Sequence, residues 1–125
     1  MLVFRGFDKL SAWESPVVAV GSFDGVHLGH VRILRFLREQ AGQVGGVSVV
    51  LTFDPHPRTV LHPDPDFFPI NTLDENLRLI GQQGIDAAVV QPFTEEFSQM
   101  TYRQFIQEVI VGKLRAHTLV MGPNH

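Results

Sequence analysis

The sequence contains no cysteine among its 125 residues, which excludes a disulfide framework and a thiolate metal site. No apolar run approaches the roughly 20 residues that cross a bilayer, and residues 1–5 lack the basic and apolar segments of a signal peptide. There is no run of basic residues and the net charge is −3, which argues against a nucleic-acid-binding domain. We therefore expect a cytoplasmic protein with neither a nucleic-acid nor a membrane partner.

The chain is rich enough in apolar residues, at 44%, to form a core, and short β-branched runs alternate in it with segments of helical spacing. Strands are predicted at 16–20, 47–53, 85–90 and 118–121, and helices at 28–40, 74–83 and 101–113, with Gly42 and Gly45–Gly46 ending the first helix. Thr72 or Asp74 is predicted to cap the second helix and Thr94 a short helical turn, and residues 61–72 form a proline-containing loop. This alternation predicts an α/β fold with a Rossmann-like parallel sheet flanked by helices.

Polar or conformationally special residues follow each predicted strand. They are Gly21–Asp24, Asp54–Pro57, Gln91–Thr94 and Gly122–His125. Ligands of open parallel sheets bind beyond the carboxyl ends of the strands, so we expect these four segments to form one shared site.

The segment Gly21–His30 has the composition of a phosphate-binding junction between a strand and a helix. Free N–H groups and the positive end of the helix dipole favour anions there. His27 and His30, with Gly29 between them, can hydrogen-bond the charge that develops during phosphoryl or nucleotidyl transfer. Zinc is a poorer interpretation, because two histidines without cysteine need further ligands and none has matching spacing.

The residues from Gly21 to His30 resemble the signature of the nucleotidyltransferase superfamily that uses a His-x-Gly-His motif. That motif alone leaves pantetheine-phosphate, nicotinamide-nucleotide and cytidylyl transferases open. Thr52–Pro57, which reads Thr-Phe-Asp-Pro-His-Pro, is similar to the flavin-site segment of bacterial FAD synthetases. Further segments match that family in the same order, at 71–75, 84–86, 92–98 and 119–122.

This resemblance implies that residues 1–125 are the N-terminal part of an FMN adenylyltransferase domain, truncated at its C-terminal side. The family's later Ser-Ser-Thr-x-Ile-Arg segment, which contacts ATP phosphates, is absent from these residues. So is the riboflavin kinase module to which the domain is natively fused. The chain also reads Gly122-Pro123-Asn124 where the family usually has Gly-Tyr-Asn or Gly-Ala-Asn, and Pro123 removes an N–H there.

The reaction implied by the resemblance is adenylyl transfer from ATP to FMN, giving FAD and pyrophosphate. ATP and FMN are then the partners, and Mg²⁺ is expected to be held mainly by phosphate oxygens and water, with no protein residue assigned as a metal ligand. The expected catalytic residues are His27 and His30, the ATP-binding residues are Gly21, Ser22, Phe23, Asp24 and Gly29, and the flavin-binding residues are Phe53, Asp54, Pro55, His56, Pro57 and Asn124.

Several of these residues also have a purely structural interpretation. Asp24 is expected to fix its turn by bonding local N–H groups more than to contact a ligand or the metal, and the same two roles are about equally open for Asp54. His56 is either a rigid loop residue or part of the site, and Phe67–Phe68 either closes over a flavin ring or anchors its loop to the core. Trp13 and Tyr102 are expected to serve packing only.

Two alternatives for the function remain open. One is a different His-x-Gly-His adenylyl or cytidylyl transferase, against which the Thr52–Pro57 segment argues. The other is a non-catalytic flavin- or nucleotide-binding fragment, which follows if the absent C-terminal segment is required for the reaction.

Overall fold

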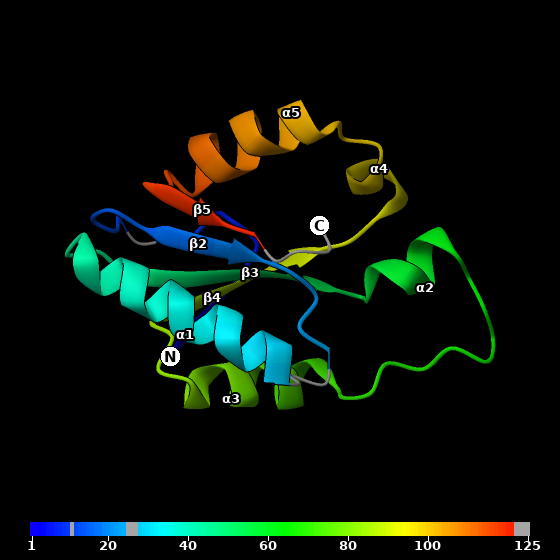
Figure 1. The fold of residues 1–125 in the computed structure, drawn as a ribbon. Coiled ribbons are helices and arrows are strands. Elements are labelled where there is room, and N and C mark those ends of the chain that lie inside the picture. Colours follow the sequence, from blue (N-terminus) through cyan, green and yellow to red (C-terminus); the bar gives the residue numbers. More distant parts are fainter. Residues whose placement is uncertain (11, 25–27, 122–125) are drawn as a thin grey trace.

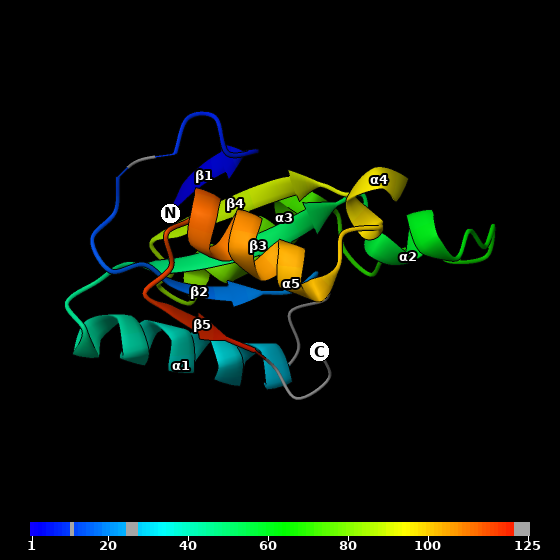
Figure 2. The same ribbon diagram turned by 90° about the horizontal axis from the view of Figure 1, so that it is seen from above.

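Five strands form one parallel sheet in the computed structural model, which describes residues 1–10, 12–24 and 28–121. In chain order they are β1 (Leu2–Arg5), β2 (Val17–Val20), β3 (Ser48–Asp54), β4 (Ala87–Pro92) and β5 (Thr118–Val120). Across the sheet the order is β1-β4-β3-β2-β5, which Figure 2 shows from above. Every neighbouring pair is parallel, so the expected α/β fold with a parallel sheet is confirmed.

Helices cover both faces of this sheet. They are α1 (Leu28–Gln43), α2 (Pro57–Leu61), α3 (Leu73–Gln82), α4 (Glu95–Ser98), α5 (Tyr102–Gln104) and η1 (Phe105–Lys113). Figure 1 shows α1 and α3 below the sheet and the α5–η1 helix above it, with α2 and α4 beyond the ends of β3 and β4. Within the described residues, no helix has both the length and the apolar character needed to cross a membrane.

The three central strands are buried on both faces, which is why their sequences are continuously apolar. Alternate side chains of β2 point to opposite layers. Val17 and Ala19 belong to the core beneath α1, whereas Val18 and Val20 pack toward η1. The sheet therefore separates the core packed against α1 from the core packed against η1, and a third, smaller cluster includes residues of α3 and β4.

Three local features differ from the sequence-based expectation. Residues 2–5 were not predicted as a strand, yet β1 pairs with β4 at the edge of the sheet, with Leu2 opposite Ala87. The first helix continues through Gly42 to Gln43. Pro57, expected only to end the preceding strand, also begins the short helix α2, where its missing N–H has no intrahelical partner to lose.

The predicted helix at 101–113 forms, but most of it is π-helical. After the three residues of α5, η1 bonds its backbone groups five residues apart, and the N–H of Leu114 donates to the carbonyl of Val109 at 2.9 Å. A Cβ at Gly112 would lie 3.0 Å from the Gln107 carbonyl oxygen, so glycine suits this wider winding. π-Helices are rare, and they occur mostly as single turns inside α-helices, frequently at functional sites.

Two of the predicted helix caps are confirmed. Thr72 and Glu75 form a reciprocal capping box at the start of α3, in which each side chain accepts from the other's backbone N–H. The Thr94 hydroxyl likewise accepts from the N–H of Phe97 and caps α4. These caps fix where the loops at the sheet edge re-enter regular structure.

Candidate active site at the carboxyl edge of the sheet

The carboxyl ends of the strands meet at one edge, because all paired strands are parallel. From β2 the chain moves through β3 to β4 on one side, and then crosses back to β5 on the other side of β2. The end of β2 is therefore the switch point of the sheet, where open α/β folds bind their ligands. Residues 21–24, expected to line the adenylate site, follow β2 at this point, whereas 122–125, which follow β5, lie outside the described residues.

The turn after β2 is built around the side chain of Phe23. Gly21 donates its N–H to the carbonyl of Leu51 at 3.1 Å, which extends the β2–β3 pairing by one residue. Phe23 has a left-handed φ of 52°, and its ring is buried in the core beside α1. A Cβ at Gly21 would lie 3.0 Å from that ring, so the absence of a side chain lets the ring close over the strand end. Phe23 thus leaves mainly its backbone to face a ligand.

His30 lies in the first turn of α1, in contact with this buried ring. Its imidazole is half-buried, with its centroid 5.3 Å from the Phe23 ring centroid and the two planes inclined at 57°. Gly29 before it is exposed. The first turn of α1 carries no acidic side chain, so nothing within that turn offsets the positive end of the helix dipole. His27 and Gly25, the other motif residues here, lie outside the described residues, as does Asn124.

Asp24 binds backbone groups far from it in the sequence. Its Oδ2 accepts from the N–H of Ile70 at 2.8 Å, and its Oδ1 accepts from the N–H of Asn71 at 3.0 Å. Partial burial raises the pKa of Asp24, but the hydrogen bonds from Asn71, Ile70 and the Asn76 side chain, together with the charge of His56, leave that pKa below its ordinary value. The carboxylate thus fastens the loop before α3, whereas the local N–H groups directly after Asp24, which the sequence predicts it to bond, lie outside the described residues.

The segment after β3 is tied both to this turn and to β4. The hydroxyl of Thr52, which is buried, donates to the carbonyl of Ser22 at 3.2 Å and so links the two sequence motifs directly. The carbonyl of Asp54 accepts from the N–H of Phe93 at 3.0 Å, while the residue itself is exposed. His56 caps α2, since its Nδ1 accepts from the N–H of Arg58 at 3.1 Å.

One aromatic ring of the 62–72 loop packs on this cap. The Phe67 ring lies 5.3 Å from the His56 ring, and the Arg58 guanidinium stands 4.3 Å from the centre of the same Phe67 ring. Phe68 instead is 78% exposed. The expectation that Phe67 and Phe68 together anchor the loop to the core is thus wrong for Phe68, and Phe67 contacts the flavin-motif segment instead.

A small polar pocket of about 50 Å³ lies where the two motifs meet. Its lining residues come from the turn after β2, the segment after β3, and the loop and first turn of α3: Ser22, Asp24, Phe53, Asp54, His56, Pro69, Asn71, Leu73 and Asn76. Five of the nine were expected from the sequence as nucleotide- or flavin-binding residues. The structure therefore brings together in one hollow residues of both predicted half-sites.

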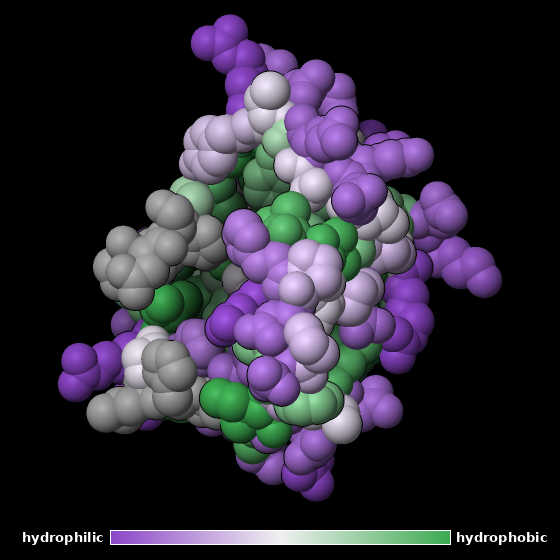
Figure 3. Space-filling view, turned by 90° about the vertical axis from the view of Figure 1, so that its right-hand side faces the viewer, coloured by the Kyte–Doolittle hydropathy of each residue, from purple (hydrophilic) through white to green (hydrophobic). Residues whose placement is uncertain are grey.

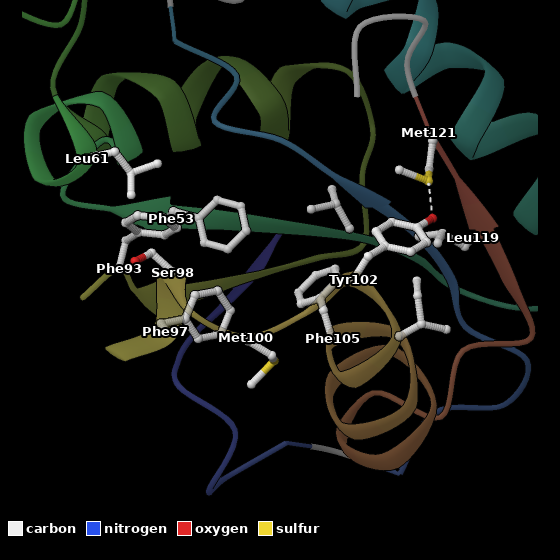
Figure 4. A pocket seen from close by; sticks show the side chains of 12 residues that line it. Phe53, Leu61, Phe93, Phe97, Ser98, Met100, Tyr102, Phe105, Leu119 and Met121 are labelled. Atoms are coloured by element: carbon white, nitrogen blue, oxygen red, sulfur yellow. Dashed lines mark hydrogen bonds between the residues drawn. The ribbon is translucent and has the colours of Figure 1, made fainter. Parts of the chain in front are cut away.

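A larger apolar cavity of about 360 Å³ opens beside it, between the sheet and the α5–η1 helix. Figure 3 faces this edge and shows apolar surface in a hollow beside hydrophilic surface. Twelve residues line the cavity: Val20, Phe53, Leu61, Phe93, Phe97, Ser98, Met100, Tyr102, Phe105, Ile106, Leu119 and Met121. Figure 4 shows Phe53, Phe93 and Phe97 on one side and Tyr102 and Met121 on the other. Phe53 lines both hollows.

Most of this cavity was not anticipated from the sequence. Tyr102, expected only to pack, is 63% exposed at the cavity, and its hydroxyl donates to the Met121 sulfur at 3.2 Å. Phe97, expected only to follow a helix cap, packs its ring against Phe53, Phe93 and Phe105 at centroid distances of 5.8, 5.8 and 6.1 Å. Ten phenylalanines in 125 residues were a usable signal of an aromatic site, though not of its position.

No three His, Cys, Asp or Glu side chains gather into a metal site within residues 1–10, 12–24 and 28–121. Asp24 and Asp54 are the carboxylates of the small pocket, and Asp24 already holds two backbone N–H groups. This donor set fits a magnesium ion whose ligands are mainly phosphate oxygens and water rather than a protein cage.

Curated relatives of this chain carry the name bifunctional riboflavin kinase/FMN adenylyltransferase. The chain is 36% identical over 109 residues to the bifunctional riboflavin kinase/FMN adenylyltransferase of Listeria monocytogenes, covering 86% of this chain and 34% of that protein. With the Escherichia coli K12 protein of the same name it is 32% identical over 124 residues, covering 98% and 40%. The chain thus spans between a third and two fifths of the length of these curated relatives.

A solved structure shares the fold over nearly the whole chain. It is a Streptococcus pneumoniae protein described as a macrolide-efflux protein, with a TM-score of 0.85 and 26% identity, covering 97% of this chain and 48% of that one. At the family level, the FAD synthetase family matches residues 9–125, which include both motifs and the carboxyl ends of β2, β3, β4 and β5. The chain therefore belongs to the FAD synthetase family.

Proposed function

We propose that the intact protein transfers an adenylyl group from ATP to FMN, forming FAD and pyrophosphate. The observation that carries this proposal is the sheet edge that both motifs share. Residues of the phosphate motif and of the flavin motif line one polar pocket, and Phe53 continues from it into an apolar cavity of about 360 Å³. The bifunctional relatives support the same reaction, since the second half of their name describes it.

We assign the nucleotide to the turn after β2 and the start of α1. Backbone groups of Gly21, Ser22 and Phe23 line this side, where the helix dipole is positive. We assign to His30, whose ring packs against the Phe23 ring, the role of donor to a phosphate oxygen. His27 has the same predicted role from outside the described residues.

We assign the flavin ring to the apolar cavity. Its volume lies within the usual range of small-molecule sites, roughly 300–1,000 Å³, and such sites are mostly apolar with few polar groups. The Phe53, Phe93, Phe97 and Phe105 rings supply the faces and edges against which a large aromatic ring packs. The FMN phosphate would then extend toward the pocket that Phe53 shares with Asp54 and His56.

In this reaction the protein acts mainly by positioning the two substrates. A phosphate oxygen of FMN attacks the α-phosphorus of ATP, a new oxygen–phosphorus bond forms, and the bond to the departing pyrophosphate breaks. The attacking phosphate is already an anion at neutral pH, so no strong general base is needed. Positioning and charge stabilisation by fixed donors supply the rate. A magnesium ion bound with the nucleotide would neutralise part of the polyphosphate charge.

The remaining expectations belong to this proposal as well. The relatives join FMN adenylyltransferase to riboflavin kinase in one polypeptide, which supports the predicted fusion of this domain to a kinase module. The cytoplasmic location expected from the sequence stays a prediction.

The reaction is tested by incubating the intact protein with ATP, magnesium and FMN, and separating flavins by chromatography. We expect FAD with FMN as acceptor and no adenylylated product with phosphopantetheine or nicotinamide mononucleotide. Quenching of flavin fluorescence without FAD formation would favour a non-catalytic binding protein. Adenylylation of another acceptor would contradict the assignment of the flavin.

The first substitution to make is His30→Ala. Loss of a preorganised donor costs roughly 10²- to 10³-fold in rate, so FAD formation should fall by about that factor while the thermal unfolding profile keeps a single cooperative transition. His62→Ala is the matched control, because His62 is exposed in the loop after α2. Unchanged FAD formation in His30→Ala would remove His30 from the proposed site.

A further inference from the structure

The contact between Asp24 and the loop before α3 joins two segments whose relative position matters for the proposed reaction. Both carboxylate oxygens are engaged, one by the N–H of Ile70 and the other by the N–H of Asn71, at 2.8 and 3.0 Å. These donors are successive backbone groups, 46 and 47 residues from Asp24. A single side chain thus fixes the direction of the loop as well as its distance from the turn after β2.

A second polar side chain completes this contact from α3. Asn76 is 8% exposed, hydrogen-bonds the Asp24 carboxylate, and accepts from Asn71 Nδ2 at 3.3 Å. Its N–H donates to the carbonyl of Thr72, whose side chain caps the helix. The first turn of α3 is therefore held by the same group of atoms, which we name the Asp24 clamp: the Asp24 carboxylate, the N–H groups of Ile70 and Asn71, and the Asn76 side chain.

The two ends of the clamp belong to different halves of the candidate site. On one side Asp24 directly follows Ser22 and Phe23 and precedes the His-x-Gly-His segment. On the other side, the loop carries Phe67, whose ring packs on His56 in the flavin-motif segment. The clamp is a direct hydrogen-bonded connection between the phosphate-binding turn and that loop.

We propose that Asp24 is a positioning residue that holds the 62–72 loop and the start of α3 against the phosphate-binding turn, rather than a ligand of the nucleotide. This inference deepens the proposed function and rests on it. An in-line displacement is sensitive to the relative placement of its two reactants, and an error of about 1 Å can cost 10²-fold in rate. Releasing the loop therefore weakens the reaction without removing any group that touches ATP.

The test compares Asp24→Asn with Asp64→Asn in the intact protein. Asn keeps the size of Asp24 but places an N–H₂ group against a backbone N–H, so one clamp bond is lost. Asp64 lies in the same loop, and its Oδ1 accepts a backbone N–H from Asp66 at 2.9 Å, so it makes the same kind of bond within the loop alone. Three quantities are measured: amide hydrogen exchange at Ile70 and Asn71, the Kd values of ATP and FMN separately, and kcat.

We expect Asp24→Asn to speed exchange at Ile70 and Asn71 at least about tenfold, to weaken FMN binding, and to lower kcat by roughly 10- to 100-fold. The Kd of ATP should stay at its wild-type value, and Asp64→Asn should leave all three quantities unchanged. A weaker Kd for ATP with unchanged exchange would overturn the proposal, because Asp24 would then be a nucleotide ligand. Faster exchange with wild-type kinetics would overturn it too, since the contact would then not affect the reaction.

Asn76→Ala provides a second route if Asp24→Asn does not fold. It removes the α3 side of the clamp while leaving the Asp24 carboxylate in place. Faster amide exchange, weaker FMN binding and a lower kcat are therefore expected again, each changed less than in Asp24→Asn. Wild-type kinetics in Asn76→Ala, with faster exchange at Asn71, would overturn the proposal. A wild-type protein that forms no FAD overturns the proposed function instead, and the exchange and FMN-binding measurements on the variants still decide whether the clamp shapes the site.

Discussion

Two polar side chains at the carboxyl edge of the sheet accept hydrogen bonds from backbone N–H groups. Asp24 holds the N–H groups of Ile70 and Asn71, and His56 Nδ1 holds that of Arg58. Each bond fixes a loop whose other side chains line the candidate site. At this scale the motif residues shape the site as much as they offer ligands to it.

The charge of Asp24 makes a pH-dependent contribution to stability. Burial raises its pKa, but the bonds from Asn71, Ile70 and Asn76 and the charge of His56 leave the pKa lowered from its ordinary value of 3.8. A group with a lowered folded-state pKa stabilises the fold above its unfolded pKa, and that contribution is lost as pH falls through the folded pKa. Glu75, whose pKa is lowered chiefly by the N–H of Thr72, behaves in the same direction.

We therefore expect the stability difference between wild type and Asp24→Asn to be largest near neutral pH and to shrink below about pH 4. Urea unfolding of both proteins between pH 7 and pH 2.5 measures this difference. The pH-dependent contribution of Glu75 cancels in the comparison, because both proteins contain Glu75. A difference that stays constant down to pH 2.5 would show that the charge of Asp24 contributes nothing.

At the scale of single elements, the sequence was most informative where burial is strongest. The central strands were predictable because both faces of residues 17–20, 48–53 and 87–90 are covered, which demands continuous apolar runs. The edge strand β1 was not predictable in this way, since three of its four residues are exposed and such a short strand carries no pattern of burial. The π-helical winding of η1 also escaped prediction, because its apolar spacing satisfies an ordinary α-helix equally well.

Replacing glycine by alanine is expected to have opposite effects on stability at two positions, one near the end of α1 and one just after it. Gly42 lies exposed within the helix with nothing near its absent Cβ, so Gly42→Ala should stabilise the protein by up to about 1 kcal/mol. A Cβ at Gly46 would overlap the backbone carbonyl of Ser15, so Gly46→Ala should destabilise it by roughly 1–3 kcal/mol. Urea unfolding of the two variants side by side checks this, and midpoints that shift in the same direction would contradict it.

At the scale of the whole molecule, the two sides of the sheet differ in character. The side of α1 and α3 is closed by fully buried residues such as Leu34, Leu37 and Ile80. The side of η1 carries the apolar cavity at its carboxyl end. Residues from β2, β3, α2, α4, α5, η1 and β5 line that cavity, so neither its existence nor its size follows from any one stretch of sequence.

A larger side chain that fills the cavity should weaken FMN binding without changing ATP binding. Ile106 lines the cavity from η1, so Ile106→Trp is expected to weaken FMN binding at least about tenfold while ATP binding stays unchanged. Val111→Trp is the control on the same helix, because Val111 is 57% exposed and lies outside the lining. Fluorescence titration with FMN gives the affinities, and equal FMN affinity in the two variants would place the flavin elsewhere.

The pairing of β1 with β4 sets an order of events during synthesis on the ribosome. Leu2 finds its partner only when Ala87 has been made, 85 residues later. At about 5–20 residues per second, that interval is roughly 4–17 s. Throughout it, Leu2, Val3 and Phe4 keep unpaired backbone groups and apolar side chains, a state that promotes aggregation unless chaperones shield it. The nascent chain thus leaves β1 without its partner strand until 85 further residues have been made.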